Sequence, residues 1–322
     1  MKKILQFAFF IAVNATSILL HAQDIQFSKV EDAALLFNPA ATMKASSQAT
    51  LLYRNIQTQG QSAYVSTAGI VTLDYHPIKV DTMQQTSYFS FTIGMTNENA
   101  LQHVLTTSSA LLGVGYHLSL NKKGLLLSLA FQTQFNNSSI DFSGQILPNQ
   151  LDAYGINSAI APSDIIYNKG AIQWMSVHSG LNLSNTSAHN AWYLGLGMRH
   201  VNQPSVAWQE NKANFSLPMS LTTQMGYSYF DTHKTLGVYA YSAKRAKATE
   251  LLFGVYAQKP LNFLNTSIKL GLAYRSGDGL IPSCDLSWSR TKLGLSYDLG
   301  NATNASIITK HALEIGLNYK FK

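Results

Sequence analysis

Apolar and polar residues alternate strictly along the last segment of the chain, residues 313–321. The two sets are Leu313, Ile315, Leu317, Tyr319 and Phe321 at odd positions, and Glu314, Gly316, Asn318 and Lys320 at even positions. Successive side chains of a β-strand point to opposite faces, whereas an amphipathic helix needs apolar residues three and four positions apart. The pattern therefore predicts a strand with one face suited to lipid and the other to water.

The same two-residue period recurs upstream of this strand. It is clear in residues 114–120, 125–132, 192–199, 268–275, 284–289 and 293–300. Strands that cross a membrane need about 9–11 residues each, and single-chain bacterial barrels have an even number of strands. We therefore predict an all-β protein, a transmembrane antiparallel β-barrel of about 14 strands, formed by residues 48–322.

Turn-forming residues separate the predicted strands. Asn121–Gly124 and Ser276–Gly279 are predicted to be short hairpin turns. Longer polar stretches cover Asn136–Asn168 and Asn202–Pro218. In a membrane barrel short turns face the periplasm and longer loops face outward, so the two long stretches are candidates for a partner-binding surface.

The N-terminal part of the chain does not show the alternation. Residues 1–22 have the features of a cleaved secretory signal: Lys2 and Lys3, an apolar run, and Ala22 at the cut. An anchor helix is the alternative, but polar residues interrupt the run. Residues 23–47 are mixed and partly compatible with a helix around Glu31–Phe37. We expect this segment to plug or cap one end of the barrel.

Composition favours a membrane barrel over a soluble β-protein. Only 12% of residues are charged, against roughly 25% in soluble domains. The net charge of +7 is spread along the chain, so nothing indicates a nucleic-acid partner. Cys284 is the only cysteine, which excludes an internal disulfide, and it alternates with Leu286 and Trp288 as an apolar strand residue. These features predict export to the bacterial outer membrane and contact with membrane lipid.

Motifs for catalysis or cofactor binding are weak. The histidines do not pair at metal-binding spacing, and no Gly-x-Ser-x-Gly elbow occurs. Gly113-Val114-Gly115 and Gly195-Leu196-Gly197 lack the third glycine of a dinucleotide loop. We interpret these glycines as relief of crowding on the lumen face, where other backbone or a plug comes close. We expect no catalytic, cofactor or metal site, and so no enzyme.

Scattered charges are expected to pair inside the barrel, because unpaired charge within a membrane is costly. The candidate bases are Arg54, Arg199, Arg275 and Arg290, and the candidate acids are Asp74, Asp278, Asp285, Asp298 and Glu314. A lumen network that holds the interior rigid is the preferred interpretation of these residues. The alternative is a catalytic group of carboxylates.

Several local motifs occur together in an order that runs through nearly the whole mature chain. They are Asn38-Pro39-Ala40, Tyr53-Arg54, Asp74 with Pro77, His200 with Pro204, Tyr274-Arg275 with Asp278, and Tyr297-Asp298. Together they resemble the PorP/SprF family of type IX secretion system membrane proteins. The resemblance implies an outer-membrane barrel without catalytic activity. These residues are its candidate structural or partner-binding positions.

The resemblance also implies the partners. They are the type IX secretion machinery and a secreted substrate with a C-terminal sorting domain, including adhesins used in gliding motility. The barrel is then expected to bind such a protein and help to export it or anchor it at the surface. Three alternatives remain open: a passive porin or hydrophobic-solute channel, a barrel enzyme acting on lipid or envelope polymers, and a purely structural barrel.

Overall fold

The computed structural model describes residues 25–321 except for 43–45, 59–60, 78–86, 101–103, 122–123, 142–150, 153–154, 157–170, 207–214, 262–264 and 301–309. The proposed signal segment, residues 1–22, lies outside this described part. Within it, no helix is long and apolar enough to cross a membrane. The only α-helix described is α2, Ala34–Phe37.

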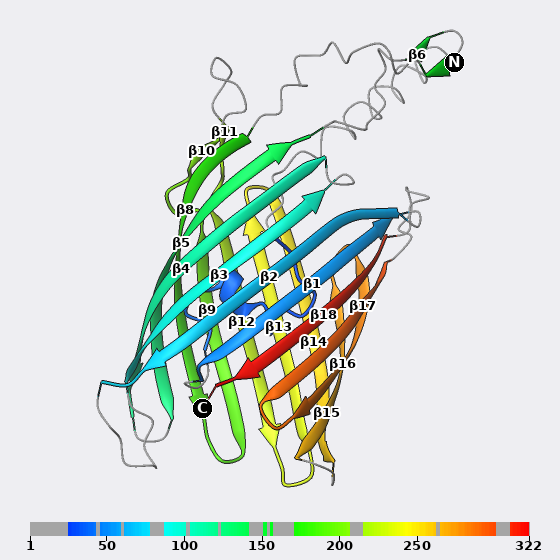
Figure 1. The fold of residues 1–322 in the computed structure, drawn as a ribbon. Helices are drawn as coiled ribbons and strands as arrows, with labels where there is room; N and C mark the ends of the chain where they lie inside the picture. The colour runs from blue at the N-terminus through cyan, green and yellow to red at the C-terminus, as the bar shows by residue number, and fades with distance from the viewer. Residues whose placement is uncertain are drawn as a thin grey trace, which may run out of the picture.

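Fourteen strands of the described chain form a closed barrel (Figure 1). They are β1 (Gln48–Thr58), β2 (Gln61–Tyr75), β3 (Tyr88–Ala100), β4 (Leu105–Ser119), β5 (Leu125–Ile140), β8 (Ala171–Thr186), β9 (Asn190–Arg199), β12 (Ser220–Phe230), β13 (Thr235–Arg245), β14 (Ala248–Leu261), β15 (Thr266–Arg275), β16 (Gly279–Trp288), β17 (Thr291–Gly300) and β18 (Lys310–Lys320). Two short hairpins, β6 (Leu151–Asp152) with β7 (Gly155–Ile156) and β10 (Ser205–Val206) with β11 (Phe215–Ser216), lie outside the barrel sheet. The predicted fold class is confirmed.

Every neighbouring pair of barrel strands is antiparallel, and the barrel closes between its first and last strands. In that closing pair Arg54 is opposite Glu314 and Tyr53 is opposite Ile315. Closure leaves no unpaired strand edge, which a bilayer does not tolerate. The strand with the clearest alternation in the sequence thus completes the barrel.

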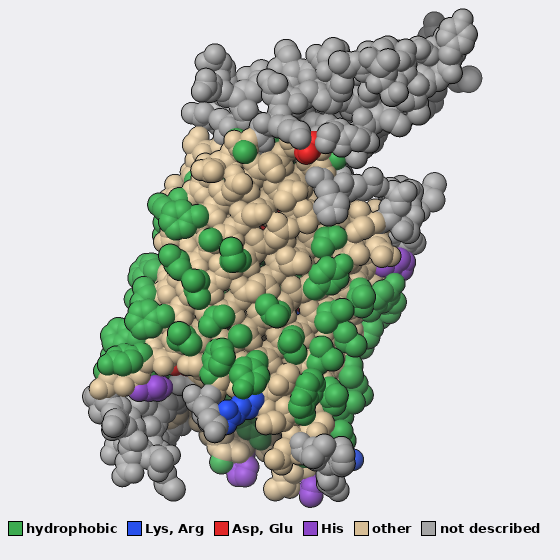
Figure 2. Space-filling model, viewed as in Figure 1, with side chains coloured by type: hydrophobic (Ala, Val, Ile, Leu, Met, Phe, Trp, Pro, Cys, Tyr) green, Lys and Arg blue, Asp and Glu red, His purple; other side chains and the backbone are tan. Residues whose placement is uncertain are grey.

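The alternation separates the two faces of the wall. On β18, Leu313, Ile315 and Leu317 are exposed on the outside, while Ala312 and Glu314 are buried toward the lumen. The same pattern repeats around the barrel, and Figure 2 shows apolar side chains spread over the outer wall, most densely away from the loop end. An apolar exterior with a polar lining is the arrangement that a lipid environment selects.

The connections divide between two ends of the barrel. One end, the terminal end, carries the start of β1, the end of β18 and the Asn121–Gly124 turn. The other, the loop end, carries residues 141–170 and 200–219 between strands. The expectation that the short turns gather at the end opposite the long loops is wrong for Ser276–Gly279. Successive barrel strands run in opposite directions, and β15 runs from the terminal end to the loop end. The turn that joins β15 to β16 therefore lies at the loop end.

The predicted loop Asn136–Asn168 also begins too early. Residues 136–140 continue β5 and pair with β8, since their side chains keep the two-residue alternation beyond the apolar part of the strand. Residues 142–150, 153–154 and 157–168 of this predicted loop lie outside the described part, as do residues 207–214 of the predicted loop Asn202–Pro218.

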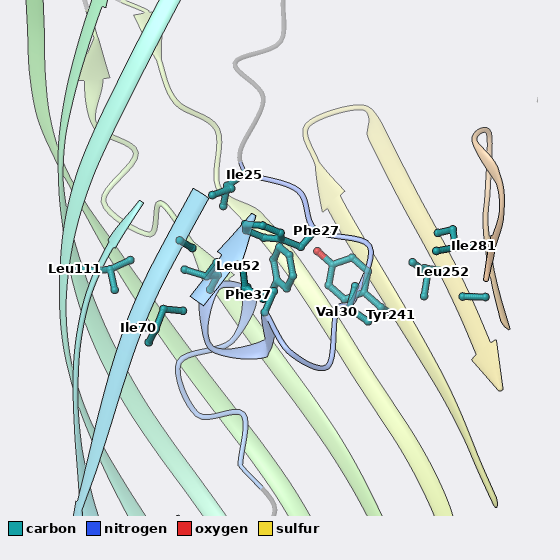
Figure 3. Packing of buried hydrophobic residues seen from close by; sticks show 14 residues of the cluster. Ile25, Phe27, Val30, Phe37, Leu52, Ile70, Leu111, Tyr241, Leu252 and Ile281 are labelled. Carbon is teal, nitrogen blue, oxygen red and sulfur yellow. The ribbon is translucent and has the colours of Figure 1, made fainter. Parts of the chain in front are cut away.

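Residues 25–40 lie inside the barrel, where their apolar side chains bridge opposite walls (Figure 3). The cluster consists of Ile25, Phe27, Val30, Ala33, Leu36 and Phe37 from this segment, Leu52, Ala68, Ile70 and Leu111 from one wall, and Tyr241, Leu252, Ala273 and Ile281 from the other. We call residues 25–40 the lumen segment. Its apolar side chains give a polar-lined barrel a hydrophobic core.

Candidate functional site in the barrel lumen

A buried carboxylate from β17 joins two arginines from different strands. Asp298 Oδ2 lies 2.6 Å from Arg54 Nη2 on β1 and 3.1 Å from Arg275 Nη1 on β15. Both arginines are almost fully buried. Charge inside a protein is stable only when it is paired and hydrogen-bonded, so this three-residue cluster fixes the relative positions of three strands.

The lumen segment is bound to the same cluster. Ser28 Oγ donates a hydrogen bond to Asp298 Oδ1 at 2.6 Å. Arg54 Nη1 donates to the carbonyl of Gln26 at 3.0 Å, and Arg275 Nη2 donates to the carbonyl of Phe27 at 3.1 Å. Hydrogen bonds with one charged partner are the stronger kind. The arginines therefore join the segment backbone to the wall.

Glu314 of β18 holds the backbone of the segment from another side. Its carboxylate accepts hydrogen bonds from the amides of Ser28, at 2.5 Å, and Lys29, at 3.0 Å. Arg54 Nε lies 3.9 Å from the same carboxylate. These contacts satisfy backbone donors that no neighbouring strand could reach.

Four lysine–carboxylate pairs continue the network along the segment. Lys29 pairs with Asp285 on β16 and with Asp32, which also pairs with Lys292 on β17. Burial raises the pKa of Asp32, but the charges of Lys292 and Lys29 outweigh burial and hold that pKa below its usual value. In addition, Glu31 pairs with Lys269 on β15. The segment thus carries charge complementary to the wall.

Glycines of β8 and β9 make room for the segment. A Cβ atom on Gly197 would come within 2.3 Å of the Phe37 carbonyl, and one on Gly180 within 2.1 Å of Asn38 Oδ1. The Asn38 side chain accepts from the amide of Ala40 at 3.0 Å and donates to the Leu181 carbonyl at 3.2 Å. This confirms the interpretation of lumen-face crowding for Gly195 and Gly197, but the interpretation is wrong for Gly113, where an added Cβ would meet only ordinary contacts.

We expect Gly197→Ala to destabilise the protein by about 1–3 kcal/mol, the usual cost of overpacking. The new methyl group would collide with backbone, which cannot rotate away as a side chain can. Gly113→Ala on β4 is the matched control, because its nearest contacts would lie at an ordinary 3.4 Å. Urea unfolding of both variants in detergent micelles measures the difference. Equal stability of the two variants would contradict the close packing at Gly197.

The predicted site residues separate into groups in the structure. Arg54, Arg275 and Asp298 form the buried cluster, and Asp278 adds a carboxylate 3.5 Å from Arg275. Asn38, Pro39 and Ala40 lie on the lumen segment against β8 and β9. The tyrosines of the motifs have a different position: Tyr53, Tyr274 and Tyr297 point outward and are exposed.

The remaining predicted residues lie at opposite ends of the barrel. At the terminal end, the Asp74 carboxylate accepts a hydrogen bond from the Ser46 amide, and the Asp74 amide donates one to Ser47 Oγ at 2.9 Å. Pro77 is exposed at the same end. His200 Nδ1 lies 2.9 Å from Ser176 Oγ at the loop end, and the Pro204 carbonyl accepts from the amide of Leu217. The motif residues therefore do not form one site.

The predicted arginine–acid network is confirmed for Arg54 and Arg275 but not for every arginine. Arg199 Nε lies 3.4 Å from Nδ1 of His178. The prediction is wrong for Arg290, which lies in the turn between β16 and β17 and forms no ion pair with a described residue. Asp74 also lies apart from the cluster, because β2 brings it to the terminal end.

Several residues of the network could not be identified from the sequence. Ser28, Lys29, Asp32 and Lys292 contact partners more than 250 residues away, and no local spacing indicates those pairs. The only signal was the mixed character of residues 23–47, with charges among apolar residues. Among the described residues, no three His, Cys, Asp or Glu side chains group in a way that could hold a metal ion.

Between the segment and the terminal end lies a cavity of about 710 Å³ with a mixed polar and apolar lining. It is lined by Asp32, Asp74, His117, Asn182, Arg290 and Lys292, among others. Residues of the lumen segment, among them Val30, Glu31 and Leu35, also line this cavity.

A closed barrel with an apolar outer wall and a polar, charge-paired interior defines an outer-membrane β-barrel protein. Solved structures with the same fold include the toluene transporter TbuX of Ralstonia pickettii, at TM-score 0.51 and 11% identity, covering 90% of this chain and 94% of that one. The toluene transporter TodX of Pseudomonas putida also matches, at TM-score 0.51 and 8% identity, with coverage of 93% and 94%. No curated protein sequence matches the chain.

A family model described as type IX secretion system membrane protein PorP/SprF matches residues 19–319. This is nearly the whole chain, so the chain belongs to the PorP/SprF family.

Proposed function

We propose that this chain binds an exported partner protein at the loop end of the barrel and helps to export it or anchor it at the cell surface. The type IX secretion family supports this role. On this proposal the machinery brings a substrate with a C-terminal sorting domain, such as an adhesin used in gliding motility. The barrel contributes binding surface and no catalysis.

The lumen segment is the observation that favours this proposal over a passive channel. Residues 25–40 cross the interior and are held by buried ion pairs on β1, β15, β16 and β17. A porin or hydrophobic-solute channel needs a free path, and the lumen segment lies across it. We infer that the segment closes the barrel and that the partner binds outside the lumen.

Export of the chain itself is part of the same proposal. Residues 1–22 direct it across the inner membrane, and cleavage after Ala22 leaves Gln23 as the first residue. The lumen segment then begins two residues after the new N-terminus. N-terminal sequencing of the protein purified from outer membranes tests this, with Gln23 or its cyclised form expected first.

Removing both loop-end segments tests partner binding. Deletion of residues 142–168 and 207–214 is expected to release the partner from the cell surface while the barrel still inserts. Replacing Ser187–His189, a turn at the terminal end, is the matched control and should leave retention unchanged. Immunodetection of the partner on intact cells and in the medium measures the effect. Unaltered retention in the loop-end variant would contradict the proposed binding surface.

A further inference from the structure

One side of the barrel wall is taller than the other. Strands β5 and β8 have 16 residues each, and β2 and β4 have 15. Across the barrel, β15, β16 and β17 have 10 each. A membrane needs only about 9–11 residues per strand. Figure 1 shows β4, β5 and β8 rising beyond β16 and β17 at the loop end. We call the outer face of β1–β5 and β8 the tall wall.

Cross-strand pairing aligns the outward side chains of the tall wall in rows. The last apolar row is Leu51, Gly69, Met95, Ala110, Phe135 and Met175. The row above it is Tyr53, Thr67, Asn97, Ser108, Asn137 and Gln173, and the next is Asn55, Val65, Asn99, Thr106, Ser139 and Ala171. Figure 2 shows the apolar side chains giving way to polar surface toward the loop end. This change marks the edge of the hydrocarbon layer.

The tall wall carries no charge on its described outward positions. Its polar rows consist mainly of amide and hydroxyl side chains, which already hydrogen-bond to each other, as Asn97 Nδ2 does to Ser108 Oγ at 2.8 Å. The opposite wall differs, because Lys244 and Lys259 are exposed there. Exposed protein surface is normally rich in charge, whereas the centres of protein interfaces are depleted in it.

A groove of about 930 Å³ runs along the boundary between the apolar and polar rows. Most of its lining side chains belong to the outward rows. Gly69 and Ala110 are the small residues among them, and Met95, Phe135 and Gln173 are the larger ones. Small residues at a membrane interface let two surfaces approach closely. The groove therefore extends from the hydrocarbon layer into the polar zone above it.

We propose that the tall wall is the contact face between two copies of this chain. Whatever fills the groove must contact the Met95 row, the apolar row at the edge of the hydrocarbon layer, which favours a membrane-embedded partner over a soluble exported domain. Lipid phosphate groups are attracted by Lys and Arg, which the wall lacks. Amide and hydroxyl groups both donate and accept hydrogen bonds, so the surface complements itself across a two-fold axis, as a symmetric dimer requires.

The size of the wall suits this role. Six strands about 4.8 Å apart, carrying three rows of side chains, cover on the order of 500 Å² in the plane of the sheet. A standard interface buries about 800 Å² on each partner. The three rows alone do not reach this size, so the proposed contact continues onto the apolar wall below the Met95 row. The dimer is independent of the proposed partner binding, which concerns the loops at the barrel end.

Cross-linking in intact membranes tests the dimer. Ser108→Cys is introduced in a Cys284→Ser background, and the membranes are treated with a short bismaleimide before solubilisation. We expect a product of twice the monomer mass. Ser242→Cys, outward on β13 of the opposite wall, is the matched control and should stay monomeric. A product of monomer mass only, or equal cross-linking of the two variants, would overturn the proposal and would favour lipid in the groove.

Lysine substitutions on the tall wall give a second test of the dimer. Asn97→Lys with Asn137→Lys places like charges face to face, which costs several kcal/mol across an interface, so cross-linking through Ser108→Cys should fall roughly tenfold or more. A Ser242→Lys substitution should leave it unchanged. Undiminished cross-linking in the double variant would also overturn the proposal. Surface retention of the exported partner, measured in the same cells, shows separately whether the proposed function holds.

Discussion

Asp298→Asn is expected to destabilise the barrel by about 3 kcal/mol, because buried Arg54 loses its close carboxylate and buried Arg275 keeps only Glu250, at 3.0 Å, and the partly exposed Asp278. Arg54 and Arg275 both lie within 3.1 Å of Asp298 Oδ2, and neither can lose its charge. Ser28 at the same time exchanges a charged acceptor for a neutral amide oxygen. The variant should therefore loosen both the strand closure and the lumen segment.

Urea unfolding in detergent micelles measures this loss, with heat-modifiable gel migration as a check on folding. Asp278→Asn is the matched control. Its carboxylate lies 3.5 Å from the same Arg275 but is partly exposed, and such pairs contribute about 0–1 kcal/mol. A loss for Asp298→Asn no larger than the control would show that the cluster does not hold the wall together.

Deleting residues 25–40 is expected to turn a silent barrel into a conducting one. In the intact chain this segment packs against the walls through Phe27 and Phe37, the latter against Tyr241 of β13, and it neutralises wall charges through Lys29 and Asp32. Without it, the charged side chains of the fourteen strands would line a water-filled path. Single-channel recording in planar bilayers should show discrete openings for the deletion and none for the wild type.

The deletion also removes part of the hydrophobic core, so folding must be checked first by gel migration. If the deleted chain does not fold, Phe27→Ala with Phe37→Ala provides the second test. It keeps every ion pair and removes two aromatic anchors of the segment. We expect transient openings in this variant. A folded deletion barrel or double variant that stays closed would contradict closure by the segment.

The sequence was sufficient for the wall of the barrel and insufficient for its interior. Alternation at Leu313, Ile315 and Leu317 predicts which side chains face lipid, because a strand has only two faces. The number of strands follows from the length of residues 48–322 and the number of residues that each spanning strand needs. Alternation does not indicate how far a strand continues beyond the membrane. The extension of β5 through Asn136–Ile140 was therefore not predicted.

The contacts of the candidate site were the least predictable part. Arg54 and Asp298 are 244 residues apart, and they meet only because β1 and β18 close the barrel. Pairing of buried charges could be expected on energetic grounds, but the choice of partners depends on register. The lumen segment was visible only as a stretch without alternation. Its binding to Asp285, Asp298 and Glu314 depends on the closed barrel that surrounds it.

The most direct test of the central claim is quantitative mass spectrometry of proteins that co-purify with the wild-type chain in mild detergent. We expect a secreted protein with a type IX sorting domain, enriched over a purification of the chain that lacks residues 142–168 and 207–214. A barrel that purifies without such a protein, and that conducts in planar bilayers with its lumen segment in place, would contradict partner binding and favour a passive channel.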